Sequence, residues 1–192
     1  KNYLNIIGIV LVVILMNSFF IVTEKDQAIK IEFGKPVGGP ITESGLNFKI
    51  PLIQTIIKFD KRVLEWDGIA NEIPTKDNKY IFVDTFARWK ISNALEFYKS
   101  AKNEMLAQSR LDDIIDGAVR DEISNRSMGE IVRSTDRKME IYISDVKGSD
   151  EASDEELAKS GARKDIIKSI LDKVGSKLEE LNMGIEIVDV QI

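Results

Sequence analysis

The sequence predicts an α+β protein in which a transmembrane helix precedes a domain of strands and helices. Three observations predict this class. Residues 4–22 form one uncharged apolar run, apolar and polar residues then alternate in stretches up to residue 92, and apolar residues recur at helical spacing after that. The 192-residue chain is long enough to form one domain or two small ones beyond the apolar run.

The run from Leu4 to Val22 contains 19 residues, none of which is charged and 15 of which are large and apolar. At about 1.5 Å per residue, a helix of this length covers roughly 28 Å, close to the roughly 30 Å of a bilayer's hydrocarbon core. We therefore expect residues 1–22 to form a membrane anchor. The residues that represent the predicted span are Leu4, Ile9, Val12, Val13, Leu15, Phe19 and Val22.

A cleaved signal peptide is the alternative interpretation of this run. Such a peptide has an apolar segment of about 7–15 residues followed by small residues, whereas here Phe19–Val22 lead directly into Thr23–Asp26. An uncleaved anchor is therefore favoured. Its orientation stays open, because lysines flank both ends of the run: Lys1 on one side and Lys25, Lys30 and Lys35 on the other.

Strands are predicted in the first half of the chain by alternating apolar residues. They are expected at residues 27–33, 46–50 and 55–60, and a longer one is expected at residues 80–91 with a bend or bulge midway, because twelve residues is long for a strand. The buried face predicted for this longest strand consists of Ile81, Val83, Ala87, Trp89 and Ile91.

Helices are predicted in the second half by apolar stripes. One stripe consists of Leu111, Ile114, Ile115, Ala118 and Val119, and another of Ile167, Ile170, Leu171, Val174, Leu178 and Leu181. A helix at residues 139–146 and an exposed acidic loop at about 147–160 are expected between them, with the loop as either a solvated insertion or a docking site for a basic partner. Residues 182–184 supply a helix stop, and residues 185–192 form a last strand.

Composition excludes several classes of function. The chain has 27 Lys and Arg against 32 Asp and Glu, so its net charge is −5, which disfavours nucleic acid as a partner. It contains no Cys and no His, which excludes the usual zinc sites and the Ser-His-Asp and Cys-His arrangements of nucleophilic catalysis. No cofactor is predicted, because the sequence has neither a P-loop nor a dinucleotide-binding motif.

Five carboxylates lie close together in the first predicted helix of the second half. A pair of them could perform acid–base chemistry, but they lie off the apolar stripe and fit a solvated acidic face better. We therefore predict that the chain is not an enzyme. The carboxylates are Asp112, Asp113, Asp116, Asp121 and Glu122.

Apolar residues also gather around Pro51, and they allow two interpretations. They could rest on the surface of a lipid bilayer, or they could be ordinary strand core. The residues concerned are Phe48, Ile50, Leu52, Ile53, Ile56 and Ile57.

Several short motifs, in order along nearly the whole chain, resemble the SPFH or band 7 family, which includes stomatin, prohibitin, flotillin, HflK and HflC. Behind the apolar run come residues 22–28 and 31–35 and the segment 43–51. Asp60-Lys61-Arg62 is similar to the family's D-x-R strand, and Thr75-Lys76-Asp77 to its T-K-D turn. Residues 184–192 resemble the segment that closes the domain. The strand at 81–92, the short stretch before the run and the acidic insertion are most like HflC.

The resemblance implies a β-rich SPFH1 subdomain at residues 23–92 and an α+β SPFH2 subdomain at 93–192. The long helix that follows the last strand in the family has no counterpart in this sequence. The resemblance further implies a single-pass protein of the bacterial inner membrane with most of its chain in the periplasm. Such a scaffold would assemble with an HflK-like partner into a hetero-oligomeric ring or cage and would regulate the FtsH AAA protease, limiting its access to membrane substrates.

Two other functions remain open at this point. A lipid-organising, stomatin-like protein of membrane microdomains would use the apolar residues around Pro51. A membrane hydrolase would need a nucleophile, and Ser and Lys are plentiful enough that a Ser-Lys dyad is not excluded by sequence.

Overall fold

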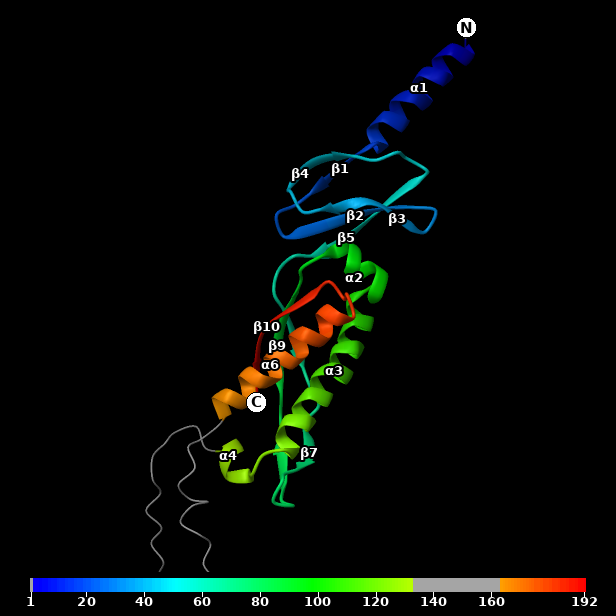
Figure 1. Cartoon of the computed structure of the whole chain (residues 1–192). Helices are drawn as coiled ribbons and strands as arrows, with labels where there is room; N and C mark the ends of the chain where they lie inside the picture. The colour runs from blue at the N-terminus through cyan, green and yellow to red at the C-terminus, as the bar shows by residue number, and fades with distance from the viewer. Residues whose placement is uncertain (1, 133–162) are drawn as a thin grey trace, which may run out of the picture. The chain divides into compact units, whose positions relative to one another are not determined.

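A computed structural model describes residues 2–132 and 163–192 (Figure 1). The helices of this part are α1 (Asn2–Asn17), α2 (Ala94–Ser100), α3 (Glu104–Ser124), α4 (Met128–Val132) and α6 (Arg163–Glu180). The strands are β1 (Phe19–Val22), β2 (Asp26–Glu32), β3 (Lys35–Ile41), β4 (Gly45–Phe48), β5 (Gln54–Asp60), β6 (Leu64–Asp67), β7 (Asn71–Pro74), β8 (Tyr80–Val83), β9 (Phe86–Ile91) and β10 (Ile185–Gln191). This mixture of sheet and helix confirms the predicted α+β class.

The strands form small sheets rather than one large one. Within the described residues, β1 pairs with β4, β7 pairs with β8, and two three-stranded sheets have the orders β3-β2-β5 and β10-β9-β6. The predicted long strand at residues 80–91 is broken at Asp84 and Thr85, and its halves β8 and β9 belong to different sheets. Its predicted inner face is confirmed, because Val83, Ala87, Trp89 and Ile91 are buried and Ile81 is half-buried.

The predicted helix over residues 4–22 is wrong at its C-terminal end. The helix α1 stops at Asn17, and residues 19–22 form β1, which pairs antiparallel with β4. None of the helices in the described residues has the combination of length and apolar character that crossing a membrane requires. Of the residues named for the span, Leu4, Ile9 and Val13 have side chains that lie outside the described part.

The chain divides into two compact units, each assembled from separate stretches of sequence. The first unit contains Lys1–Leu64, Trp89–Ala107 and Leu178–Val188, and the second contains Glu65–Arg88, Gln108–Lys177 and Asp189–Ile192. The subdomain boundary at residues 92 and 93 stays a prediction. The expected helix at 139–146 and acidic loop at 147–160 fall outside the described residues.

Aromatic packing builds the core of the first unit. Phe97 of α2 lies between two other rings, edge-on to Phe59 of β5 with centroids 5.2 Å apart and stacked with Trp89 of β9 at 6.4 Å. Gln27 is buried beside them, and its Nε2 donates to the carbonyl oxygen of Ile91 at 2.9 Å. This bond offsets the cost of burying an amide among apolar side chains.

The start of β10 is bound to the start of α2 in the same unit. The N-cap of α2 is Asn93, whose side chain accepts hydrogen bonds from the backbone N–H groups of Leu95 and Glu96. The backbone N–H groups of Ser92 and Asn93 both donate to the carbonyl oxygen of Gly184. Gly184 has φ +63°, so it ends the chain reversal after α6 in the left-handed conformation that glycine adopts readily.

Two apolar helix stripes contribute to the hydrophobic core. On α3, Leu111, Ile115 and Val119 are buried, whereas Ile114 and Ala118 of the predicted stripe are half-buried. The α6 stripe is centred one residue earlier than expected: Ile166, Ile170, Val174 and Leu178 are buried, and Ile167 and Leu171 are half-buried. The prediction is wrong for Leu181, which is exposed because α6 ends at Glu180.

Glu122 joins α3 to α6 through polar contacts in the second unit. Its side chain is only 9% exposed, and its Oε1 lies 2.5 Å from Nζ of Lys173 and 2.8 Å from the hydroxyl of Ser169, which donates to it. These hydrogen bonds, with that from Lys173 the larger, lower the pKa of Glu122 below its usual value. The ion pair therefore stabilises the packing of the two helices.

Replacing Glu122 by glutamine should destabilise the chain at neutral pH and much less in acid. A carboxyl whose pKa is lowered in the folded state contributes stability above its unfolded pKa, near 4.5, and loses it as the pH falls through the folded value. We expect the free energy of unfolding to fall by about 1–2 kcal/mol at pH 7. The loss should be smaller than for a fully buried ion pair, because Lys173 is half exposed and solvent screens its charge.

Urea unfolding of both proteins at pH 7 and pH 3 measures this difference. The gap between wild type and Glu122→Gln should narrow at pH 3, and a gap of equal size at both values would contradict the assignment.

Candidate membrane-contact site

The end of α1 is fastened directly to the strands that follow it in the first unit. Ser18 is buried between helix and strand, and its hydroxyl donates to the carbonyl oxygen of Ile14 at 2.9 Å. The carbonyl of Ser18 accepts from the backbone N–H of Lys49 at 2.8 Å. Ser18 is the only residue between α1 and β1, and it is hydrogen-bonded to both the helix and the strand region. The apolar residues of α1 are therefore followed by those of β1 without a flexible linker.

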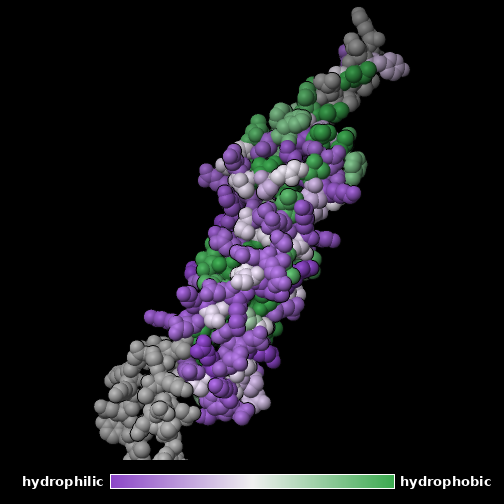
Figure 2. All heavy atoms as spheres, viewed as in Figure 1, coloured by the Kyte–Doolittle hydropathy of each residue, from purple (hydrophilic) through white to green (hydrophobic). Residues whose placement is uncertain are grey.

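Four large apolar side chains project from one face of the β1–β4 pair. The register places Phe19 opposite Phe48 and Ile21 opposite Leu46, so alternation along each strand puts all four on the same side. They are 51%, 53%, 61% and 68% exposed, respectively, and the two phenylalanine rings pack edge to face at 5.9 Å. We call these residues the apolar strand face. Figure 2 shows apolar residues gathered over α1 and the strands next to it.

The turn after β4 exposes a further leucine. Leu52 is 98% exposed and has φ +71°, a conformation that is uncommon for residues other than glycine. The turn is held by Gln54, whose Oε1 accepts from the backbone N–H of Ile50 at 2.9 Å and whose own N–H donates to the Ile50 carbonyl oxygen at 2.9 Å. A strained backbone that presents an apolar side chain to solvent is typical of a contact site rather than of a core.

The sequence-predicted contact residues divide into two groups. Phe48, Ile50, Leu52 and Ile53 are exposed at the end of β4 and in the turn, whereas Ile56 and Ile57 are half-buried in β5. Sequence reasoning did not assign Ile21 or Leu46 to the surface. The alternation of Phe19 with Ile21 was the available signal, but it was hidden inside the predicted helix.

A lysine of β5 bonds the backbone of the apolar strand face. The Nζ of Lys58 donates to the carbonyl oxygen of Ile21 at 2.8 Å, and the Nζ of Lys61 reaches the carbonyl oxygen of Thr42 at 3.4 Å. Next to Lys61, the Arg62 guanidinium binds the Asp60 carboxylate and lowers its pKa, which explains the spacing of the D-x-R motif. Cationic side chains near an apolar surface suit the headgroup region of a bilayer.

The T-K-D turn has a structural role in the second unit. Thr75 is buried, and its hydroxyl donates to the carbonyl oxygen of Lys79 at 2.9 Å. The carboxylate of Asp77 accepts from the backbone N–H of Met128, the first residue of α4. The turn therefore fixes the start of α4, a helix terminus that otherwise has unsatisfied N–H groups.

The carboxylates of α3 have separate surroundings. Asp112 accepts from Nε1 of Trp66 at 2.6 Å, Glu122 belongs to the ion pair with Lys173, and Asp116 lines a small pocket. Burial raises the pKa of Asp116, with a smaller contribution from the charge of Asp112. In the described part of the chain, no group of three or more acidic residues is arranged to hold a metal ion. These contacts favour structural roles for Asp112 and Glu122.

Comparison with known proteins finds relatives in bacteria. Protein HflC of Treponema pallidum is 32% identical over 187 residues, which cover 93% of this chain and 56% of that protein. Protein HflC of Borreliella burgdorferi is 33% identical over 181 residues, covering 93% and 55%. The modulator of FtsH protease HflC of Escherichia coli K12 is 30% identical over 213 residues, covering 100% and 62%.

The chain thus spans somewhat more than half the length of the curated relatives it matches. The SPFH domain/Band 7 family matches residues 20–192, which include every described strand apart from Phe19 of β1 and every described helix except α1. The family resemblance expected from the short motifs is therefore confirmed. The chain belongs to the SPFH domain/Band 7 family.

Proposed function

We propose that this protein is a non-catalytic scaffold bound to the bacterial inner membrane that modulates an FtsH-type protease. The observation that carries the membrane part is the apolar strand face, which continues from the apolar helix α1 through the bonded residue Ser18. An exposed cluster of four large apolar side chains is costly in water and marks a site of contact. The part concerning the protease rests on similarity to the Escherichia coli relative, whose name describes it as a modulator of FtsH.

In this proposal α1 is inserted in lipid as the membrane anchor and the apolar strand face lies against the bilayer surface. The remainder of the chain lies in the periplasm and pairs with an HflK-like protein in a ring or cage around the protease. Such an enclosure would limit the access of membrane substrates to the protease without any chemical step of its own.

Single-cysteine variants test the membrane contact, because these 192 residues contain no cysteine and each label on them is therefore unique. A small fluorophore attached at Leu46→Cys or Leu52→Cys should be quenched by spin-labelled lipids in reconstituted vesicles. The control is Asp113→Cys, an exposed position on α3. If the label at residues 46 and 52 is quenched no more than the label at residue 113, the membrane contact is wrong.

Crosslinking in intact membranes tests the scaffold. We expect it to recover a second SPFH protein and an AAA protease, and we expect the protease to degrade a membrane-protein substrate more slowly when both SPFH proteins are present. A chain that stays monomeric at native expression, or a degradation rate that does not respond to it, would refute this proposal.

A lipid-organising, stomatin-like function is the second candidate, and the exposed Leu52 turn favours it. The two candidates differ in what the purified chain does alone. A lipid organiser should change the lateral distribution of labelled lipids in vesicles that contain no protease, whereas a protease modulator should not.

A further inference from the structure

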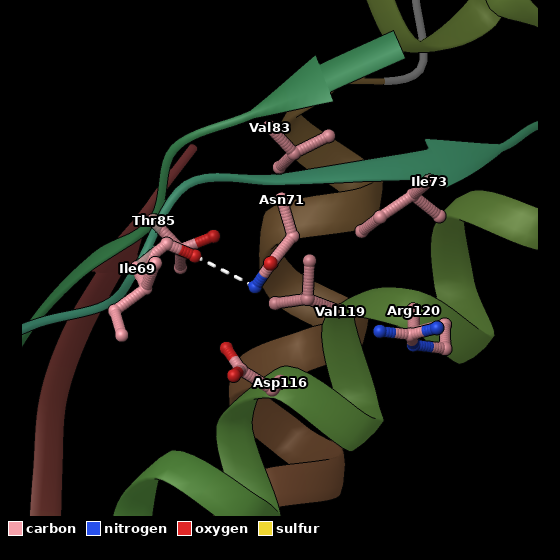
Figure 3. Close-up of a pocket in the computed structure, with 8 residues that line it drawn as sticks. All are labelled: Ile69, Asn71, Ile73, Val83, Thr85, Asp116, Val119 and Arg120. Atoms are coloured by element: carbon pink, nitrogen blue, oxygen red, sulfur yellow. Dashed lines mark hydrogen bonds between the residues drawn. The ribbon is translucent and has the colours of Figure 1, made fainter. Parts of the chain in front are cut away.

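A small pocket in the second unit lies between α3 and the strands β7 and β8 (Figure 3). Its apolar walls are Ile73, Val83 and Val119, all of which are buried. The pocket holds about one water-sized group and opens to the surface next to Ile69, which is 83% exposed.

Two neutral oxygen atoms are available as acceptors in this pocket. The Asn71 side chain donates from Nδ2 to the Ile69 carbonyl oxygen at 2.7 Å, which leaves its Oδ1 as an acceptor (Figure 3). Thr85 is only 6% exposed, and its hydroxyl has no hydrogen-bond partner among the described residues. Every fully buried side-chain oxygen in that part of the chain has a hydrogen-bond partner. The Thr85 hydroxyl, which has none, is therefore not fully buried but opens to the pocket that Thr85 lines.

The third acceptor carries a negative charge. Asp116 points its carboxylate toward the pocket from α3 in Figure 3. Burial and the neighbouring Asp112 raise the pKa of Asp116, and Arg120 only partly opposes them. The charged groups that act on Asp116 are two further carboxylates, Asp112 and Asp113, and one guanidinium, that of Arg120, which also lines the pocket. In Figure 3 the Arg120 guanidinium and the Asp116 carboxylate lie on opposite sides of Val119, so a cation beside Asp116 would offset the repulsion between the carboxylates.

We propose that this pocket binds the ammonium group of a lysine side chain presented by a partner protein. An ammonium group has three N–H donors and no acceptor, which matches the acceptors of Asn71, Thr85 and Asp116. It is close to water in size, whereas the planar guanidinium of arginine is larger than the space. The apolar walls and the exposed Ile69 side chain suit the four methylene groups of the lysine stem. This site is separate from the membrane contact and does not depend on it.

Titration with a lysine derivative tests the proposal directly. The probe is Nα-acetyl-lysine methylamide, added to the whole chain in neutral detergent while methyl NMR signals of Ile73, Val83 and Val119 are followed. We expect saturable shifts with a dissociation constant of about 1–10 mM, a range that suits so few contacts. The matched control is the same compound acetylated on Nε, which has lost its charge and should produce no saturable shift.

Two isosteric variants identify the acceptors. Asp116→Asn should weaken binding about tenfold or more, because a charge-assisted hydrogen bond becomes a neutral one, and Thr85→Val should weaken it about three- to tenfold. Ethanolamine, which has a short stem, should bind at least several-fold more weakly than the lysine derivative.

The outcomes that would overturn the proposal are equally specific. Absence of saturable shifts at 100 mM probe, equal shifts from the acetylated control, or unchanged affinity in Asp116→Asn would each mean that the pocket holds only water. Equal binding of ethanolamine would exclude the lysine stem as the feature recognised.

Discussion

Replacing Gly184 by alanine should lower the free energy of unfolding by about 3 kcal/mol or more, the largest loss of stability that we expect from a single methyl group. A Cβ at this position would lie 2.4 Å from the carbonyl oxygen of Asn93 and 2.7 Å from the backbone nitrogen of Phe97. Both are backbone atoms at the start of α2, so no side chain can turn aside. The left-handed φ of +63° adds strain for any residue with a Cβ.

The damage would extend beyond the steric contact. The carbonyl oxygen of Gly184 accepts hydrogen bonds from Ser92 and Asn93, and Asn93 caps α2. Moving Gly184 away from Asn93 therefore weakens those two bonds and disturbs the cap. Thermal unfolding followed by circular dichroism should show a midpoint roughly 6–12 °C lower than in the wild type.

Gly117 provides the matched control. It lies in the middle of α3, nothing is within 4 Å of a Cβ built there, and it is exposed. Gly117→Ala should raise the stability by about 0.5–1 kcal/mol, because alanine has the higher helix propensity. If Gly184→Ala has the same midpoint as the wild type while Gly117→Ala is stabilised, the backbone at the start of α2 does not approach Gly184 closely enough to exclude a Cβ, and the prediction is wrong.

Placing lysine at both Val12 and Val13 should abolish retention of the chain in membranes. Each lysine in the middle of an inserted apolar helix costs about 2.5–3.5 kcal/mol, so the pair should reduce the inserted population more than about a thousandfold. Both positions lie in α1, whose sequence from Asn2 to Asn17 contains no charged residue. The expected effect is large because α1 has no acidic side chain that could form an ion pair with the introduced lysines inside the bilayer.

Fractionation of cells followed by alkaline carbonate extraction measures this retention. The control changes both valines to leucine, which keeps the helix apolar and should leave the chain in the membrane pellet. A lysine variant that stays firmly in the pellet would refute insertion of α1 and leave the apolar strand face as the remaining source of membrane affinity.

The outcome at residues 19–22 shows where a sequence pattern is ambiguous. Phe19, Phe20, Ile21 and Val22 are uncharged and apolar, so they fit the end of a helix in lipid as well as a strand. Pairing with β4 decides between the two, because the register from Phe19–Phe48 to Val22–Gly45 satisfies the backbone hydrogen bonds of both strands. That pairing involves residues more than twenty positions away, and periodicity within the run carries no information about it.

The sequence by itself determined the family, the α+β class and the buried faces of some regular elements. These follow from local patterns, because a period of two or 3.6 residues fixes which side chains share a face. The inner face of β8 and β9 and the buried residues Leu111, Ile115 and Val119 of α3 were accessible in this way.

Only the tertiary structure decided which polar and apolar residues meet across the chain. The contacts of Trp66 with Asp112 and of Glu122 with Lys173 join residues 46 and 51 positions apart, and the apolar strand face exists only once β1 and β4 pair. The physical reason is that such contacts depend on the relative placement of elements in each unit, which the packing of their buried faces sets and which no local period encodes.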